Sequence, residues 1–215
     1  LAGGTANVWA KESRAGRDPR KAMRAIVGGE RRRVDLGRAG ERYFLLMAGV
    51  GLDAAIIPGV GARLKRRLGA AAYIVAGVRT LFRYRGRRVS LRIDGEAQER
   101  EMYWLLAGNT RSYGGIVNIT HRAVITDGLL DVGIMARGGV WRLASDLARL
   151  LLRRHDRSPN IAFVRAGAID IETPGIPVQV DGEPLGETPL RVEAAPAALT
   201  VIVPRGARLA LFGER

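Results

Sequence analysis

Residues 89–107 read VSLRIDGEAQEREMYWLLA, and within them alternating side chains give way to a continuous apolar run. From Val89 to Ile93 every second residue is apolar, which is the period of a strand buried on one face. Asp94-Gly95 is a typical two-residue hairpin turn, and the apolar run at residues 102–107 supplies the returning strand. The stretch therefore predicts a β-hairpin and indicates a fold built mainly from strands.

Other short apolar segments surround this hairpin, with glycine and proline between them. Short strands at such spacing are typical of a β-sandwich. A hairpin connection is expected at residues 37–40, between the first two segments. The expected strands are Val34–Leu36, Tyr43–Met47, Ala123–Ile125, Leu130–Ile134, Ala168–Ile171, Pro177–Val180, Leu190–Glu193 and Leu199–Val203.

Two segments have the spacing of amphipathic helices instead. Apolar residues recur every three or four positions over residues 63–84 and again over residues 140–155. In the second segment Arg142, Asp146 and Arg149 lie on the face opposite the apolar residues. Residues from about 30 to 205 are therefore expected to form one mainly β (α+β) domain, a β-sandwich with two flanking helices.

The composition is that of a globular protein, with 215 residues, 47% hydrophobic and 26% charged. The chain has no cysteine, which excludes a disulfide framework and cysteine-based zinc or redox chemistry and fits a reducing compartment. The longest apolar runs, such as residues 68–78, are broken by glycine or arginine and are too short to cross a bilayer. We therefore expect a cytoplasmic protein without a transmembrane helix.

The net charge of +14 comes almost entirely from arginine, since only Lys11, Lys21 and Lys65 are lysines. One interpretation is the codon bias of a GC-rich genome, and the other is attraction to an anionic surface. Aromatic residues make up 6% of the chain and no nucleic-acid module is recognisable, so a nucleic-acid partner is not expected. Four arginines and Trp141 on the segment 140–155 instead favour peripheral attachment to an anionic membrane. They are Arg142, Arg149, Arg153 and Arg154.

Two glycine-containing motifs lie in the first quarter of the chain. Residues 3–10 read GGTANVWA, in which small residues permit close approach to a phosphate while a hydroxyl and an amide offer hydrogen bonds. Residues 47–54 read MAGVGLDA and place a carboxylate at the end of a strand. Each motif alone is equally compatible with an ordinary turn.

Two acidic turns follow a Tyr-Gly-Gly sequence at residues 113–115. Residues 127–131 read DGLLD, whose first carboxylate and neighbouring carbonyls offer oxygen ligands for a hard cation. Residues 180–183 read VDGE, in which mutual repulsion of two carboxylates favours a proton-accepting role for one of them. Solvated surface hairpins remain the alternative for both turns.

The six segments GGTANVWA, AGVGLDA, YGG, DGLLDV, VDGE and ALTVIVP occur in an order that resembles the carboxy-terminal portion of the diacylglycerol kinase and sphingosine kinase family. The resemblance covers nearly the whole chain. It implies a carboxy-terminal domain of an NAD kinase/diacylglycerol kinase-like fold. Residues 1–30 would be a remnant of the nucleotide-binding domain, 31–205 the β-sandwich substrate domain and 206–215 a tail. The family's Gly-Gly-Asp-Gly-Thr nucleotide loop does not occur in this sequence.

The resemblance also implies roles for individual residues. Glu183 would be the catalytic proton acceptor that takes the proton of a lipid hydroxyl as that oxygen attacks ATP. Contacts to ATP would come from Gly4, Thr5 and Asn7. A structural Mg²⁺ would be held by Asp127 and by the backbone carbonyls of Val124 and Leu129.

Three positions depart from the family pattern. Val8 stands where many members have an aspartate that organises catalytic magnesium, which makes diacylglycerol a less certain substrate. Ile116 replaces the usual third glycine after Tyr-Gly-Gly, and His121 lies near the place of a usual proline. Because the last two lie close to the proposed cation loop, they bear on whether Mg²⁺ binds there.

The sequence as a whole predicts an ATP-dependent lipid kinase acting on a diacylglycerol-like or sphingoid lipid. Without the nucleotide loop, the residues shown are not expected to form a competent kinase. The expected partners are the lipid substrate and an anionic membrane surface, and an oligomer is possible. The alternatives are an NAD kinase-like enzyme, or a basic module that binds membranes or nucleic acid without catalysis.

Overall fold

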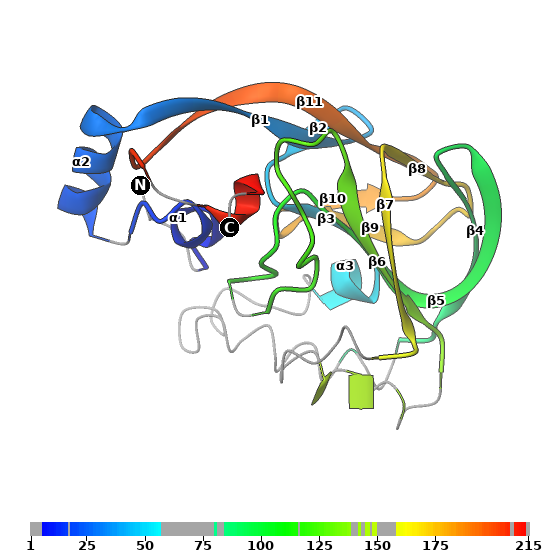
Figure 1. Cartoon of the computed structure of the whole chain (residues 1–215). Coiled ribbons are helices and arrows are strands. Elements are labelled where there is room, and N and C mark those ends of the chain that lie inside the picture. The colour runs from blue at the N-terminus through cyan, green and yellow to red at the C-terminus, as the bar shows by residue number, and fades with distance from the viewer. Residues whose placement is uncertain are drawn as a thin grey trace.

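A computed structural model describes residues 6–16, 18–56, 80, 84–115, 117–138, 142, 145, 146, 148, 149, 158–206 and 209–213. These residues form one 11-stranded sheet in which every pairing is antiparallel. The sheet curls over, so that most of its strands contribute to one shared core (Figure 1). The prediction of a mainly β, sandwich-like fold is therefore confirmed.

The sheet follows the order β10-β9-β3-β5-β4-β8-β11-β1-β2, and β6 and β7 branch from β5. The strands are β1 (Glu30–Ala39), β2 (Arg42–Phe44), β3 (Met47–Gly51), β4 (Arg87–Ile93), β5 (Glu96–Gly108), β6 (Leu130–Ala136), β7 (Ile161–Ala166), β8 (Ala168–Ile171), β9 (Pro177–Val180), β10 (Glu183–Glu187) and β11 (Leu190–Val203). The helices are α1 (Val8–Glu12), α2 (Pro19–Gly28), α3 (Leu52–Ile56) and the short 3-10 helix η3 (Ala210–Phe212).

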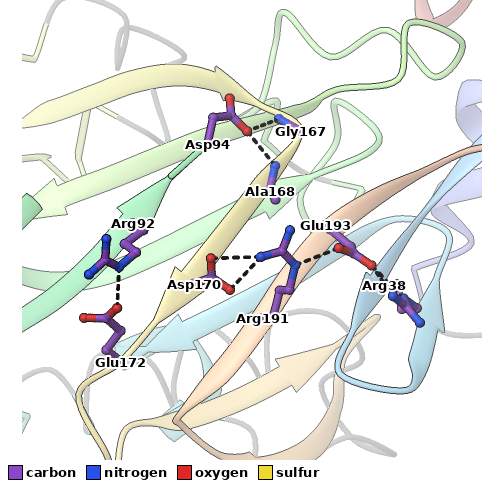
Figure 2. A network of polar contacts seen from close by, with 9 residues as sticks. All are labelled: Arg38, Arg92, Asp94, Gly167, Ala168, Asp170, Glu172, Arg191 and Glu193. Atoms are coloured by element: carbon purple, nitrogen blue, oxygen red, sulfur yellow. Dashed lines mark hydrogen bonds and ion pairs between the residues drawn. The ribbon is translucent and has the colours of Figure 1, made fainter. Parts of the chain in front are cut away.

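The β4–β5 hairpin forms as the sequence predicts. Asp94 and Gly95 have φ angles of 48° and 87°, the left-handed pair that a tight hairpin turn requires. The Asp94 carboxylate also accepts hydrogen bonds from the backbone N–H groups of Gly167 and Ala168, at 2.9 and 2.8 Å (Figure 2). The same turn therefore joins the hairpin to the start of β8.

Strand β5 is the centre of the sheet. It begins at Glu96, earlier than predicted, and its first half pairs with β4. Its second half pairs with β3 on one side and with β6 on the other, and from Met102 to Gly108 every residue is buried. The continuous apolar run in the sequence thus marks a strand covered on both faces.

Strands β1 and β11 form the longest pair in the molecule, and Figure 1 shows them arching together above the rest of the sheet. The two strands predicted at Leu190–Glu193 and Leu199–Val203 are one strand, with a register shift opposite Val34. The hairpin predicted around residues 37–40 forms between β1 and β2, but its connection is shorter than predicted and lies at residues 40–41. β1 continues to Ala39 because its pairing with β2 holds these residues extended.

Residues 123–125 are not a strand, although Ile125 is fully buried. The Ile125 carbonyl accepts the Asp35 N–H at 2.8 Å, and the Ile125 N–H donates to the Leu211 carbonyl at 2.9 Å. These two separate hydrogen bonds satisfy the backbone of Ile125 without a ladder of strand pairing. Strands β7 and β10 and helix α2 were not predicted. Charged side chains interrupt the hydrophobic pattern in β10 and α2, whereas β7 (IAFVRA) lacks the alternation of apolar and polar residues.

Only part of the two predicted helices can be assessed. Residues 63–79 lie outside the described residues, while positions 142, 145, 146, 148 and 149 are helical. Asp146, which we expected on the exposed face of the second helix, is buried. Its carboxylate accepts hydrogen bonds from Ser158 at 2.6 Å and Asn160 at 3.0 Å, which explains why it faces inward.

The outer face of the curled sheet carries alternating charges (Figure 2). Arg191 on β11 lies between Asp170, at 3.0 Å, and Glu193, at 2.7 Å, and Glu193 also accepts from Arg38 Nε at 2.9 Å. We call Arg38, Glu193, Arg191 and Asp170 the outer ladder. In the part of the chain that the structure describes, no helix is long and apolar enough to span a bilayer.

Candidate active site

The VDGE sequence forms the tight turn between β9 and β10. Asp181 and Gly182 have φ angles of 49° and 86°. The Asp181 carboxylate accepts three backbone N–H groups, each at 2.9 Å, from the connection between β2 and β3. The donors are Leu45, Leu46 and Met47. A carboxylate bound in this way positions the turn rather than serving as a base.

Glu183 follows the turn and has a largely exposed carboxylate, with 68% of the side chain accessible. It forms an ion pair with Arg42, at the start of β2. The two carboxylates of the turn are therefore directed to different partners. Of the two, only Glu183 combines solvent access with an ion-pair partner that can hold it in place.

A buried chain of hydrogen bonds lies behind this turn. Gln179 Oε1 accepts the Gly182 N–H at 2.8 Å, and Gln179 Nε2 donates to Asp53 Oδ2 at 2.6 Å. The Tyr113 hydroxyl donates to the other oxygen of Asp53. We call Tyr113, Asp53, Gln179 and the Gly182 N–H the inner relay. It connects the Tyr-Gly-Gly, GVGLDA and VDGE motifs, which are far apart in the sequence.

The local sequence around Asp53 explains its position. Asp53 lies in the first turn of α3, directly after β3, and is 6% exposed. At Gly49 a Cβ would collide with Asp53 Oδ2 and lie 2.6 Å from Gln179 Nε2, so only glycine leaves room for the relay. Burial raises the pKa of the Asp53 carboxyl, and the donors Tyr113 and Gln179 partly oppose this shift.

Helix α1, directly after the first motif, docks on the Tyr-Gly-Gly loop. Glu12 accepts the Ser112 N–H at 2.5 Å, and Lys11 Nζ donates to the Gly115 carbonyl at 3.0 Å. Desolvation raises the pKa of Glu12 despite these backbone donors. Glycine is favoured at position 115 because its φ is +73°, and an added Cβ would also displace the Lys11 ammonium, which would lie 2.5 Å away.

The residues that the resemblance assigns to ATP are only partly described. Gly4 and Thr5 lie outside the described residues. Asn7 is the N-cap of α1, with left-handed φ and ψ angles of 48° and 46°, and its side chain makes no capping hydrogen bond. Asn7 therefore lies at the end of α1, beside the segment that docks on the Tyr-Gly-Gly loop.

The proposed cation ligands surround the loop before β6. Asp127 forms an ion pair with Arg165 and accepts the Leu129 N–H at 3.0 Å. Within the described residues, the carbonyl oxygens of Val124 and Leu129 accept no hydrogen bond. Two carbonyls and a carboxylate are the donor types that Mg²⁺ prefers, so the donor set fits, although Arg165 competes for Asp127.

Two buried aspartates, Asp35 and Asp131, stabilise the loop before β6. The sequence did not predict this role for either of them. Asp35 accepts the N–H groups of Gly128 at 2.7 Å and Ala197 at 2.6 Å. Asp131 is 1% exposed, and burial raises its pKa, with the Arg122 N–H acting in the opposite direction. No group of three or more His, Cys, Asp or Glu among the described residues forms a metal site, so the cation proposal rests on the carbonyls.

Comparison with known proteins identifies the family. Residues 47–203 match the model of the YegS C-terminal NAD kinase beta sandwich-like domain. The chain belongs to the YegS-like family of lipid kinases. A probable lipid kinase YegS-like from Pseudomonas putida is 33% identical over 209 residues, which cover 96% of this chain and 68% of the relative.

Further relatives agree with this assignment. A diacylglycerol kinase from Mycobacterium tuberculosis is 31% identical, covering 94% of this YegS-like chain and 67% of the relative. The crystal structure of a putative diacylglycerol kinase from Bacillus anthracis superimposes with a TM-score of 0.76 at 25% identity. It covers 94% of this chain and 67% of the other. The resemblance predicted from the motif order is thus confirmed, and the chain spans about two thirds of these relatives.

Several residues of the site in this YegS-like chain escaped the sequence analysis. Gln179 lies between two valines in β9, and Asp35 lies between a valine and a leucine in β1. Buried polar side chains need partners, so this pattern was a usable signal. Arg42 and Arg165 carried no signal, because they are two of many exposed arginines.

Proposed function

We propose that the full-length protein carrying this chain is an ATP-dependent lipid kinase that phosphorylates a hydroxyl of a diacylglycerol-like or sphingoid lipid. The names of the relatives support a lipid kinase. The observation that carries the proposal is that direct contacts connect the family motifs to one another. The segment after GGTAN docks through Lys11 on the Tyr-Gly-Gly loop, and Tyr113 leads through the inner relay to the turn before Glu183.

Glu183 is suited to the role of proton acceptor. The lipid hydroxyl oxygen bonds to the γ-phosphorus of ATP while the bond from that phosphorus to the β,γ-bridging oxygen breaks. ADP leaves with the bonding electron pair, and the hydroxyl proton passes to the Glu183 carboxylate. The exposure of Glu183 leaves space for a substrate oxygen, and the ion pair with Arg42 restricts the carboxylate to one side of the turn.

We further propose that Gly4, Thr5 and Asn7 contact the nucleotide and that Mg²⁺ is held by Asp127 and the carbonyls of Val124 and Leu129. The left-handed Asn7 at the start of α1 supports the first assignment, and the second is supported by the Val124 and Leu129 carbonyls, which accept no hydrogen bond from the described residues. A bound Mg²⁺ would supply positive charge that fixes the loop between Val124 and Leu129. Binding there requires that Asp127 exchange or share its ion pair with Arg165.

We also propose peripheral attachment to an anionic membrane. Arg142 is exposed, and Arg149 is partly exposed with its guanidinium 3.8 Å from Asp146. Basic side chains near an anionic leaflet contribute about 1 kcal/mol each, and the attraction decreases within a Debye length. Such attachment gives an enzyme access to hydroxyls at the level of the lipid headgroups. Co-sedimentation should then increase with anionic lipid content and decrease with salt.

The decisive test is Glu183→Gln in the full-length protein. We expect phosphoryl transfer to diacylglycerol or sphingosine to fall about 10²- to 10⁴-fold, because the amide cannot accept the proton, while ATP binding persists. Glu172→Gln is the matched control, since Glu172 is also an exposed glutamate paired with an arginine, Arg92. Undiminished turnover by Glu183→Gln removes Glu183 from the mechanism. Transfer to NAD instead of lipid by the wild-type protein would favour the NAD kinase-like alternative.

A further inference from the structure

The inner relay ends on a backbone group of the catalytic turn, not on a side chain. Gln179 holds the N–H of Gly182, the residue before Glu183, at 2.8 Å. Its other polar atom is held by Asp53, which is fixed in turn by Tyr113. Neither Gln179 nor Asp53 is exposed to solvent, with 2% and 6% accessibility. The buried network therefore acts on the backbone from which Glu183 projects.

We propose that Gln179 is a positioning residue for phosphoryl transfer, with Asp53 and Tyr113 fixing its amide so that the turn holds Glu183 in its proton-accepting orientation. This inference rests on the proposed role of Glu183. Gln179 does not contact the reacting atoms in this proposal. It acts through the peptide of Gly182.

The geometry explains why the turn needs a second anchor. Asp181, the first residue of the turn, binds through its side chain to backbone N–H groups of residues 45–47. Gly182 has a φ of 86°, a conformation available to glycine at little cost, and glycine also has the greatest freedom to leave it. The hydrogen bond from its N–H to Gln179 removes that freedom on the side from which Glu183 projects.

The chemistry also explains why the anchor is an amide. Position 179 must accept the Gly182 N–H with one atom and donate to the Asp53 carboxylate with the other. An amide does both at every pH. A second carboxylate at this position would face Asp53 and satisfy the contact only by binding a proton. Tyr113 is the titratable group that hydrogen-bonds Asp53 in the described part of the chain.

The first test is Gln179→Met in the full-length protein, which keeps the approximate volume and removes both hydrogen bonds. We expect kcat to fall roughly 10- to 100-fold, the scale of misplaced catalytic groups, with KM for ATP unchanged. Hydrogen–deuterium exchange of the peptide containing residues 181–184 should accelerate. Hydrogen–deuterium exchange does not depend on turnover. It therefore tests whether Gln179 fixes the turn even if the enzyme phosphorylates another substrate.

The second test exchanges the two polar groups. In Gln179→Glu the two facing carboxylates share a proton only at low pH, so activity relative to wild type should decrease as pH rises. The double variant Asp53→Asn/Gln179→Glu moves the amide to position 53 and the carboxylate to position 179, so every hydrogen bond of the relay is retained. This variant should recover kcat at high pH. A merely structural role would not produce that pH-dependent loss and its recovery.

The outcomes separate the two proposals. If Glu183→Gln is inactive while Gln179→Met has wild-type kcat, the positioning role is wrong and the kinase proposal stands. If Gln179→Glu follows the wild-type pH profile, or the double variant fails to recover kcat while folded by circular dichroism, the positioning role is also wrong. If Glu183→Gln retains full turnover, Glu183 is not the proton acceptor and the positioning role of Gln179 is wrong with it, whereas transfer of phosphate to lipid by the wild-type protein tests the kinase proposal separately.

Discussion

The outer ladder and the inner relay each contain a carboxylate that accepts two side-chain donors, but the donors are charged on the exposed face and neutral in the buried network. In the outer ladder, Glu193 accepts from Arg191 and Arg38 on an exposed sheet face (Figure 2), and these donors lower its pKa. In the inner relay, Asp53 also accepts two donors, yet burial outweighs them and raises its pKa. The sign of the pKa shift therefore follows burial and the charge of the donors, not the number of hydrogen bonds.

This difference has consequences for stability and specificity. Exposed ion pairs are screened by water and salt and contribute little to folding. A buried donor or acceptor left without its partner costs about 1–3 kcal/mol. The relay therefore tolerates few alternative arrangements, while residues of the outer ladder can change partners. Groups that must stay in one orientation are better fixed by the buried network.

The largest expected effect comes from Gly49→Ala. The new methyl group would collide with Asp53 and Gln179 in the buried sheet, and we expect the free energy of unfolding to fall by about 3 kcal/mol. Urea denaturation measures this change. Gly28→Ala is the control, because a Cβ there has no atom within 4 Å, and it should not destabilise. Equal midpoints for the two variants would show that the relay is not tightly packed.

A smaller, pH-dependent effect is expected for Asp53→Asn. Because the folded-state pKa of Asp53 is raised, the folded protein binds more protons than the unfolded chain between the ordinary aspartate pKa and the raised value. The free energy of unfolding therefore falls as pH increases through this window, by about 1.4 kcal/mol for each unit of the shift. Asparagine removes this contribution.

Asp53→Asn should accordingly gain stability relative to wild type as pH rises from about 4 towards neutrality. The difference between the two unfolding curves is the quantity to measure, since other buried acids such as Glu12 contribute equally to both. A difference that is constant with pH would show that Asp53 titrates normally and that burial does not dominate its environment.

The smallest effect is expected in the outer ladder. Arg191→Gln removes the contacts to Asp170 and Glu193, yet Tm should change by no more than about 2 °C, and less at high salt. Thermal unfolding of Arg191→Gln, Asp170→Asn and the double variant in low and high salt measures the coupling. A salt-insensitive loss as large as that of Gly49→Ala would contradict the distinction between the two networks.

Local patterns in the sequence determined much of the fold. Alternation and Asp94-Gly95 specify the β4–β5 hairpin, because side-chain period and turn conformation are properties of neighbouring residues. The motif order also predicted the family, which the comparisons confirm. The merger of two predicted segments into β11 was not predictable in the same way. Residues on both sides of Pro196 pair with β1, and the left-handed Ala197, with a φ of 50°, lies in the irregularity where the register shifts.

The site is where only the tertiary structure decides. The sequence selected Glu183, Asp127 and the VDGE turn as candidates, but it did not reveal that Gln179 holds that turn or that Asp53 lies beside Gln179. These two residues are 126 positions apart, and their hydrogen bond exists because β3 and β9 pair in one register. Local propensity carries no information on such a contact. Desolvation, which raises the pKa of Asp53, likewise arises only when α3 packs against β3, β5 and β9.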